Sequence, residues 1–116
     1  MSSVFCVLFI ACNIGRNENT SIKVSDNTRT FRFAADYPEY KSRAVRKYFE
    51  NKFDNNPILK SSTSTEGTVK LNDGTIFQIE YEPGFFSINF NKEENSYSSY
   101  NRLKGVIADF DSVIKD

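Results

Sequence analysis

The sequence contains no histidine and no tryptophan, and both of its cysteines lie within the first twelve residues. Histidine is the commonest general base and metal ligand, so its absence removes Ser-His-Asp and Cys-His catalysis. Beyond Cys12 there is no thiol, which excludes a disulfide framework, a zinc–thiolate site and a cysteine nucleophile from the rest of the chain. The five glycines are scattered and form no phosphate-binding loop. We therefore expect a protein that is not an enzyme and that has no metal and no cofactor.

The sequence also lacks an excess of charge, because 15 lysine and arginine residues balance 15 aspartate and glutamate residues. General nucleic-acid binding needs a basic surplus to neutralise phosphates, so we expect no nucleic-acid partner. A length of 116 residues limits the chain to one domain. Eleven phenylalanines and six tyrosines supply much of the apolar surface for its core.

The longest apolar run covers residues 4–11 and is followed directly by Cys12. It is too short to span a bilayer as a helix, but long enough for the apolar part of a secretion signal. The tetrapeptide Phe9-Ile10-Ala11-Cys12 resembles the lipobox of bacterial lipoproteins, with phenylalanine where leucine or valine is usual. The sequence Met1-Ser2-Ser3 departs from the pattern, because basic residues normally precede such a run.

This resemblance implies that residues 1–12 are a signal segment and that Cys12 is the lipidated residue. Residues 13–19 are polar and contain Gly15, so they would form a tether, and residues 20–116 would form a single domain. The resemblance thus implies a small protein anchored by lipid to the membrane of the bacterial cell envelope. Its domain would bind without catalysis, and its partner would be a protein or a glycan of the envelope.

A second interpretation of the same apolar run is a buried strand, because a stretch of valine, phenylalanine, leucine and isoleucine also fits that role. The protein would then be a cytoplasmic interaction module of the antitoxin, immunity or inhibitor type, with residues 4–11 as a core strand. A small hydrolase that uses Asp or Glu side chains is a third alternative. Periodicity alone does not separate a signal segment from a strand.

The remaining sequence alternates between strand-like and helix-like patterns. Apolar residues at every second position predict strands at 21–25, 28–33, 68–71, 75–81 and 86–90. Apolar residues at three- and four-residue spacing predict helices at 36–53 and 96–114. The order ββαβββα predicts an α+β fold, in which two helices pack on one face of an antiparallel sheet to form a two-layer sandwich.

The first helix has a predicted start, a predicted buried stripe and predicted ion pairs. We expect Asp36 to cap the helix, with Glu39 completing a capping box. Two pairs at four-residue spacing, Glu39–Arg43 and Arg46–Glu50, would lie on its solvent face. The expected buried residues of this helix are Tyr40, Ala44, Val45, Tyr48, Phe49 and Phe53.

Candidate binding residues fall into two groups. Arg43, Arg46 and Lys47 make the first helix basic, which would suit phosphate, an anionic lipid surface or an acidic partner. A solvated helix face that pairs with Glu39 and Glu50 explains the same residues. Phe85 follows Gly84 and directly precedes Phe86, and neighbouring residues of a strand point to opposite faces. If Phe86 faces the core, Phe85 faces outward, so we expect it to mark a contact site.

Two further sets of residues are weaker candidates. Glu80 and Glu82 alternate with apolar residues, which is typical of the solvated side of a strand, and the sequence does not mark them as catalytic partners. Aromatic side chains could form a stacking surface for a glycan or nucleotide on the outer sheet face, although core packing explains most of them. These aromatic candidates are Tyr81, Phe85, Tyr97 and Tyr100.

Overall fold

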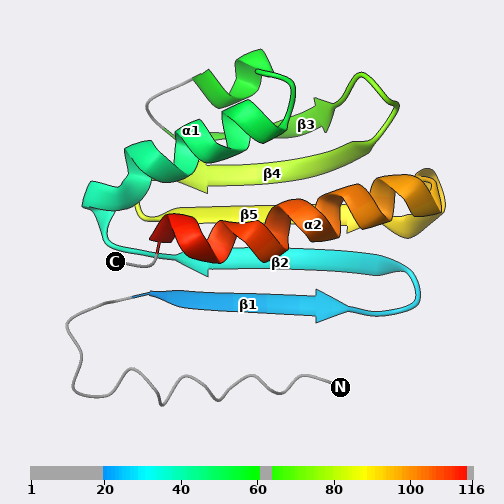
Figure 1. Ribbon diagram of the computed structural model, residues 1–116, viewed down its shortest axis with the longest axis horizontal. Helices are drawn as coiled ribbons and strands as arrows, with labels where there is room; N and C mark the ends of the chain where they lie inside the picture. Colours follow the sequence, from blue (N-terminus) through cyan, green and yellow to red (C-terminus); the bar gives the residue numbers. More distant parts are fainter. Residues whose placement is uncertain (1–19, 61–63, 115–116) are drawn as a thin grey trace.

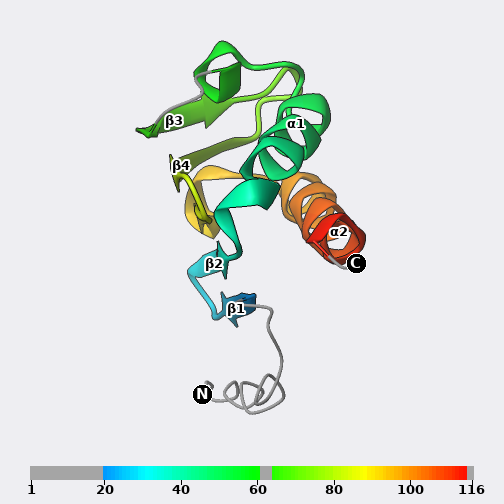
Figure 2. The ribbon, with the colours of Figure 1, turned by 90° about the vertical axis from the view of Figure 1, so that its left-hand side faces the viewer.

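The computed structural model describes residues 20–60 and 64–114, which form a two-layer α+β sandwich. Figures 1 and 2 show one antiparallel sheet with both long helices on the same face. This confirms the predicted fold class. The strands are β1 (Ser21–Asp26), β2 (Thr30–Asp36), β3 (Thr65–Lys70), β4 (Ile76–Glu82) and β5 (Phe85–Asn91). The helices are α1 (Ser42–Lys52) and α2 (Tyr97–Ile114), with 3-10 turns η2 (Glu39–Lys41), η3 (Pro57–Lys60) and η4 (Lys92–Glu94).

The segments to which the signal, tether and core-strand interpretations apply lie outside the described residues. Within the described part, the strand order across the sheet is β1-β2-β5-β4-β3. The hairpin β1-β2 and the meander β3-β4-β5 are therefore joined where β2 pairs with β5. The turn between β4 and β5 uses Gly84 at φ +85°, and the Gly84 N–H donates to Ser42 Oγ at 2.8 Å. This bond ties the start of α1 to the end of the central hairpin.

The core lies between the sheet and the helices and is built largely from phenylalanine. Phe49 of α1 is fully buried and stacks on Phe86 of β5, with 4.1 Å between the ring centroids. The ring centroid of Phe110 of α2 lies 5.1 Å from that of Phe49. Phe110 also meets the ring of Phe33 of β2 edge-on, with 5.3 Å between the centroids. The layers are thus held by aromatic contacts that connect both helices to the two central strands.

The start of the first helix differs from the prediction. Asp36 is the exposed last residue of β2, where it lies opposite Phe85 of β5, so it does not cap a helix. The next N–H, that of Tyr37, donates to the Gly84 carbonyl at 2.9 Å and extends this ladder. A residue before proline disfavours the helical conformation, so Tyr37-Pro38 delays the helix, which begins at Ser42 after the turn η2.

The later start also changes which residues of the first helix are buried. Tyr40 is 75 % exposed and Ala44 is also exposed, so the prediction that these two residues are buried is wrong. Val45, Phe49 and Phe53 are buried as predicted. In α2 the predicted stripe is confirmed, because its members are buried or packed against the core. These residues are Tyr100, Leu103, Ile107, Phe110 and Ile114.

Candidate functional site

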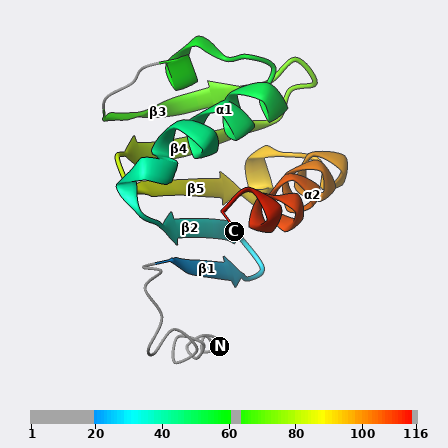
Figure 3. The ribbon, with the colours of Figure 1, turned by 60° about the vertical axis from the view of Figure 1, so that its left-hand side comes forward.

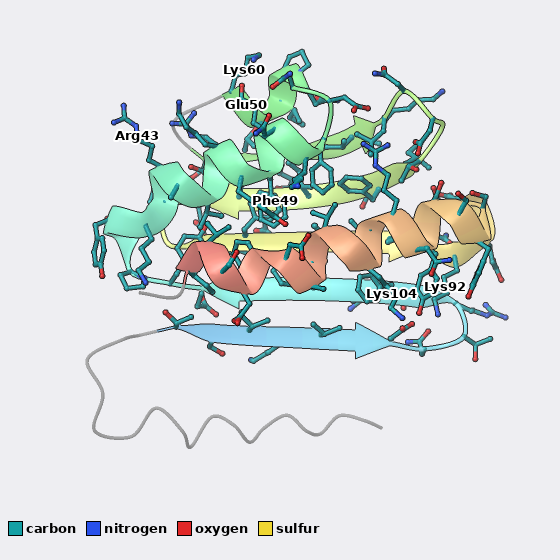
Figure 4. The ribbon with its side chains drawn as sticks, in the orientation of Figure 1. Arg43, Phe49, Glu50, Lys60, Lys92 and Lys104 are labelled. Carbon is teal, nitrogen blue, oxygen red and sulfur yellow. The ribbon has the colours of Figure 1, made fainter. Side chains whose placement is uncertain are left out.

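The basic residues predicted as a binding surface lie on the outer side of the helix layer. Arg43 and Lys47 are exposed on α1, and Arg46 is half-buried. Figure 4 shows the Arg43 side chain pointing away from the helix into solvent. A short helix with hydrophobic residues on one face leaves these long side chains to project from the other.

Neither Glu39–Arg43 nor Arg46–Glu50 is among the direct ion pairs of the described residues. Glu50 pairs instead with Lys60 of η3 at 2.6 Å, and this hydrogen bond lowers the pKa of Glu50. Both residues are labelled in Figure 4. Glu39 lies in η2, before the α-helix begins, so the helical spacing to Arg43 is lost. Among the described residues, none of the ion pairs involves the three basic candidates. Arg46 and Lys47 nevertheless lie near enough to Glu50 for their charges to lower its pKa, so Glu50 offsets part of the positive charge of this face. Arg43 takes part in none of the described ion pairs, and its charge is the most available to an anionic partner.

Phe85 lies on the other face of the protein. Its neighbour Phe86 is buried toward the helices, so the alternation of β5 directs Phe85 to the open face of the sheet, where it is half-buried. The predicted outward orientation is confirmed. The structure does not bring Phe85 together with Arg43, Arg46 and Lys47, because they belong to opposite layers. The four candidates thus belong to two surfaces rather than one site.

The open sheet face is hollowed over β3, β4 and β5. The hollow has a volume of about 300 Å³, and carboxylates, amides and hydroxyls line most of it. Concave surfaces with a few convergent polar groups are the usual places for ligands. The lining residues are Glu66, Gly67, Thr68, Gln78, Ile79, Glu80, Ser87 and Asn89.

Two carboxylates that are far apart in the sequence meet in this hollow. Glu66 of β3 lies directly opposite Glu80 of β4, and both side chains are exposed. Like charges directly opposite one another destabilise a sheet, so a cationic or hydrogen-bonding group placed between them would relieve that repulsion. The general acid of a glycosidase is held in a desolvated pocket, whereas these carboxylates face water.

A cluster around Tyr100 of α2 was not predicted. Its hydroxyl donates to Asp26 of β1, which raises the pKa of Tyr100 to about 12, and Lys92 pairs with the same carboxylate at 2.6 Å. The ammonium groups of Lys92 and Lys104, labelled in Figure 4, lie 4.6 and 5.1 Å from the centroid of the Tyr100 ring. These contacts fasten the end of the edge strand β1 to α2.

The predicted aromatic stacking surface on the outer sheet face is not formed. Tyr81 is only 2 % exposed and belongs to the core, whereas Tyr97 and Tyr100 lie on α2. Phe85 is the one member of that set on the open face. The sequence could have shown that Tyr81 does not belong to an outer surface, because it stands two residues after Ile79 and four after Phe77 and therefore points to the same buried face of β4.

No family model, no curated protein and no solved structure matches this chain. Among residues 20–60 and 64–114, no three His, Cys, Asp or Glu side chains are grouped so that they could hold a metal ion. The described helices are all too short or too polar to cross a membrane. The features that remain to indicate function are the continuous sheet, the basic face of α1 and the acidic hollow on the opposite face.

Proposed function

We propose that this protein is a lipid-anchored component of the bacterial cell envelope, processed at Cys12, whose domain binds a partner without catalysis. The resemblance of residues 9–12 to a lipobox is the basis for the anchor. Stable membrane residence takes more than one acyl chain, which the two or three chains of a lipoprotein cysteine supply. Residues 13–19 act as the tether between the membrane and the domain.

The observation that supports this proposal most is the continuity of the sheet. Neighbouring strands in the order β1-β2-β5-β4-β3 are all hydrogen-bonded to each other, so the described strands leave no space for another between them. A further strand could join only at the outer edges, beside β1 or β3. A run that is apolar at every position suits a strand buried on both faces, which an edge beside a polar open face does not offer. The signal interpretation of residues 4–11 is therefore favoured over a central strand.

The composition of the core gives a second line of support. All 20 buried apolar side chains in the described part of the chain lie between Phe31 and Ile114. Cleavage before Cys12 would remove none of them. A mature protein that begins at Cys12 therefore keeps every buried apolar side chain of the described part, as the proposal requires.

The partner in this proposal is an anionic protein or glycan of the envelope, bound by the basic face of α1. None of the described ion pairs involves Arg43, Arg46 or Lys47, and Glu50 offsets only part of the charge of Arg46 and Lys47. A locally positive surface on a chain of zero net charge attracts an anionic partner at short range, and salt screens the attraction. The cytoplasmic interaction module is the alternative, in which the same face would bind an acidic protein.

The test is the intact mass of the full-length protein, expressed in a bacterial host and separated into membrane and soluble fractions. We expect a membrane-bound species that begins at Cys12 and carries the added mass of acyl chains. Cys12→Ala should abolish both the processing and the added mass. Cys6→Ala is the matched control and should behave like the wild type, because Cys6 lies inside the apolar run. A soluble wild-type protein that begins at Met1 or Ser2 would refute the anchor.

A further inference from the structure

The edge strand β1 has an uncovered apolar side chain on the helix side of the sheet. Val24 pairs with the buried Phe33 and points to the same side, yet it is 47 % exposed. Figures 1 and 3 show the reason: α1 and α2 lie over the other strands, and neither helix reaches over β1. Tyr40 and Tyr97 are the other large hydrophobic residues exposed in the described structure, and neither is in a strand.

The backbone of the same residue faces outward. The N–H of Asn27 donates to the carbonyl of Thr30 at 2.9 Å, which makes this a hydrogen-bonded pair of the β1-β2 ladder. Such pairs alternate along an antiparallel ladder, so Ser25 and Lys23 also direct their N–H and C=O groups to β2. The N–H and C=O groups of Ile22, Val24 and Asp26 consequently point away from the sheet. An edge of this kind is a template for another strand.

We propose that a second copy of this chain pairs with β1 in an antiparallel manner, with Val24 opposite Val24 of the partner subunit. In this register Ile22 lies opposite Asp26 of the partner subunit, and Asp26 lies opposite Ile22 of the partner subunit. Each of the three residues with outward N–H and C=O groups thus faces another such residue. Three hydrogen-bonded pairs exchange two bonds each, so the two sheets join into one continuous sheet about a two-fold axis. The interface is self-complementary, because every contact occurs twice.

The side chains select this register from its neighbours. On the helix side, the two half-exposed Val24 side chains cover each other. On the open face, Lys23 lies opposite Ser25 of the partner subunit, which avoids opposed charges. A shift by one step in one direction would place Lys23 opposite Lys23 of the partner subunit, and like charges directly opposite are unfavourable. The opposite shift would place each Val24 against Asp26 of the partner subunit, so the two exposed Val24 side chains would no longer cover each other. Ile22, which lies opposite Asp26 of the partner subunit in the proposed register, is already packed against the core and needs less cover.

The test is disulfide trapping in the full chain with Cys6→Ser and Cys12→Ser, in which an introduced cysteine is the sole thiol. Under mild oxidation, Val24→Cys should form a covalent dimer, because Cα atoms of a hydrogen-bonded pair lie about 5.5 Å apart, within disulfide range. A mixture of the Lys23→Cys and Ser25→Cys proteins should form the mixed dimer. Each of these two proteins alone should form little, because two copies of the same residue are then diagonal, roughly 7–8 Å apart.

Thr68→Cys on the other edge strand, β3, is the matched control, because Thr68 is also exposed in a strand. Dimers formed by Thr68→Cys but not by Val24→Cys would overturn the proposal in favour of the β3 edge. Absence of dimers from Val24→Cys and from the Lys23→Cys and Ser25→Cys mixture would overturn it outright. If Val24→Cys fails to fold, the mixture of Lys23→Cys and Ser25→Cys still tests the proposal, because both of these positions are exposed.

The proposed dimer does not depend on the lipid anchor, so the two proposals can fail separately. Processing at Cys12 with no trapped dimer would refute only the pairing through β1. If residues 4–11 of the same chain occupied this edge, Val24→Cys would stay monomeric and hydrogen exchange would show those residues protected. That result would overturn the dimer and also the signal interpretation.

Discussion

Truncation of Phe49 to alanine should destabilise the domain more than any change on either candidate surface. The side chain is 0 % exposed, and its ring contacts five other aromatic rings. Its burial is worth about 1.5–3 kcal/mol, and the cavity left behind raises the expected loss to about 3–5 kcal/mol. Lost aromatic pairing adds to this cost. The rings within reach belong to Phe33, Tyr48, Phe53, Phe86 and Phe110.

The measurement is urea unfolding monitored by circular dichroism. The free energies of unfolding of the wild type and the variant are compared, provided that both depend on urea concentration with the same slope. A domain of this size has a total stability of about 5–15 kcal/mol, so the variant should lose a large share of it and could be partly unfolded without denaturant. Phe85→Ala is the matched control, because this phenylalanine is half-buried on the open face. We expect the control to lose less than about 1.5 kcal/mol. Equal losses from the two variants would show that the aromatic cluster does not hold the layers together.

Two further predictions concern the backbone and the basic face. Gly84→Ala should cost about 1–3 kcal/mol, because the residue has φ +85° and an added Cβ would lie 3.0 Å from the Tyr37 carbonyl oxygen. Gly105→Ala should instead raise the melting temperature, because its Cβ would meet no atom within 4 Å and alanine favours a helix by about 1 kcal/mol. In thermal unfolding, a higher melting temperature for Gly84→Ala would contradict the first argument, and a lower one for Gly105→Ala would contradict the second. Arg43→Glu combined with Lys47→Glu should lower the salt concentration that elutes the protein from a dextran sulfate column. Lys23→Glu combined with Lys70→Glu changes the net charge equally on strand residues away from α1, and an equal shift in elution would refute a localised anion-binding face.

Local periodicity was enough to predict the order of the elements and the layer architecture. Phe86, Ile88 and Phe90 are buried while Phe85 faces outward, as alternation requires. The stripe of α2 follows in the same way from its spacing, and Ser96 accepts a hydrogen bond from the Ser99 N–H before the first turn. These features depend on neighbours in the sequence, and a pattern of neighbours is what a single sequence displays.

The errors occur where a distant segment overrides the local signal. Asp36 has the context of a helix cap, but pairing with Phe85 of β5 keeps it in the sheet. The start of β3 contains no apolar alternation, and it is a strand because Thr65 and Glu66 pair with β4. Gly67 also permits the close approach of Ile58, since an added Cβ would lie 2.5 Å from the Ile58 Cδ1 atom. None of these partners can be identified from spacing in one sequence.

The same limit applies to the candidate surfaces. The basic residues of α1 were visible in the sequence, but their lack of ion pairs follows from where the helix begins and from Lys60, which takes Glu50. The opposition of Glu66 and Glu80 depends on the register of two strands. The outward N–H and C=O groups of Val24 depend on which pairs of the β1-β2 ladder are hydrogen-bonded. Surfaces made by register are properties of the sheet and not of any one segment.

The pairing of β2 with β5 has a consequence for how the protein is made. It joins Thr30 to Asn91 and Asp36 to Phe85, so the two central strands are contributed by distant parts of the chain. Closing so long a loop costs entropy before any contact repays it, which slows folding relative to local hairpins. During synthesis the hairpin β1-β2 and α1 emerge long before their sheet exists. The phenylalanines of the first half therefore stay exposed until β5 has emerged, and a factor that shields apolar segments should raise the yield of this protein.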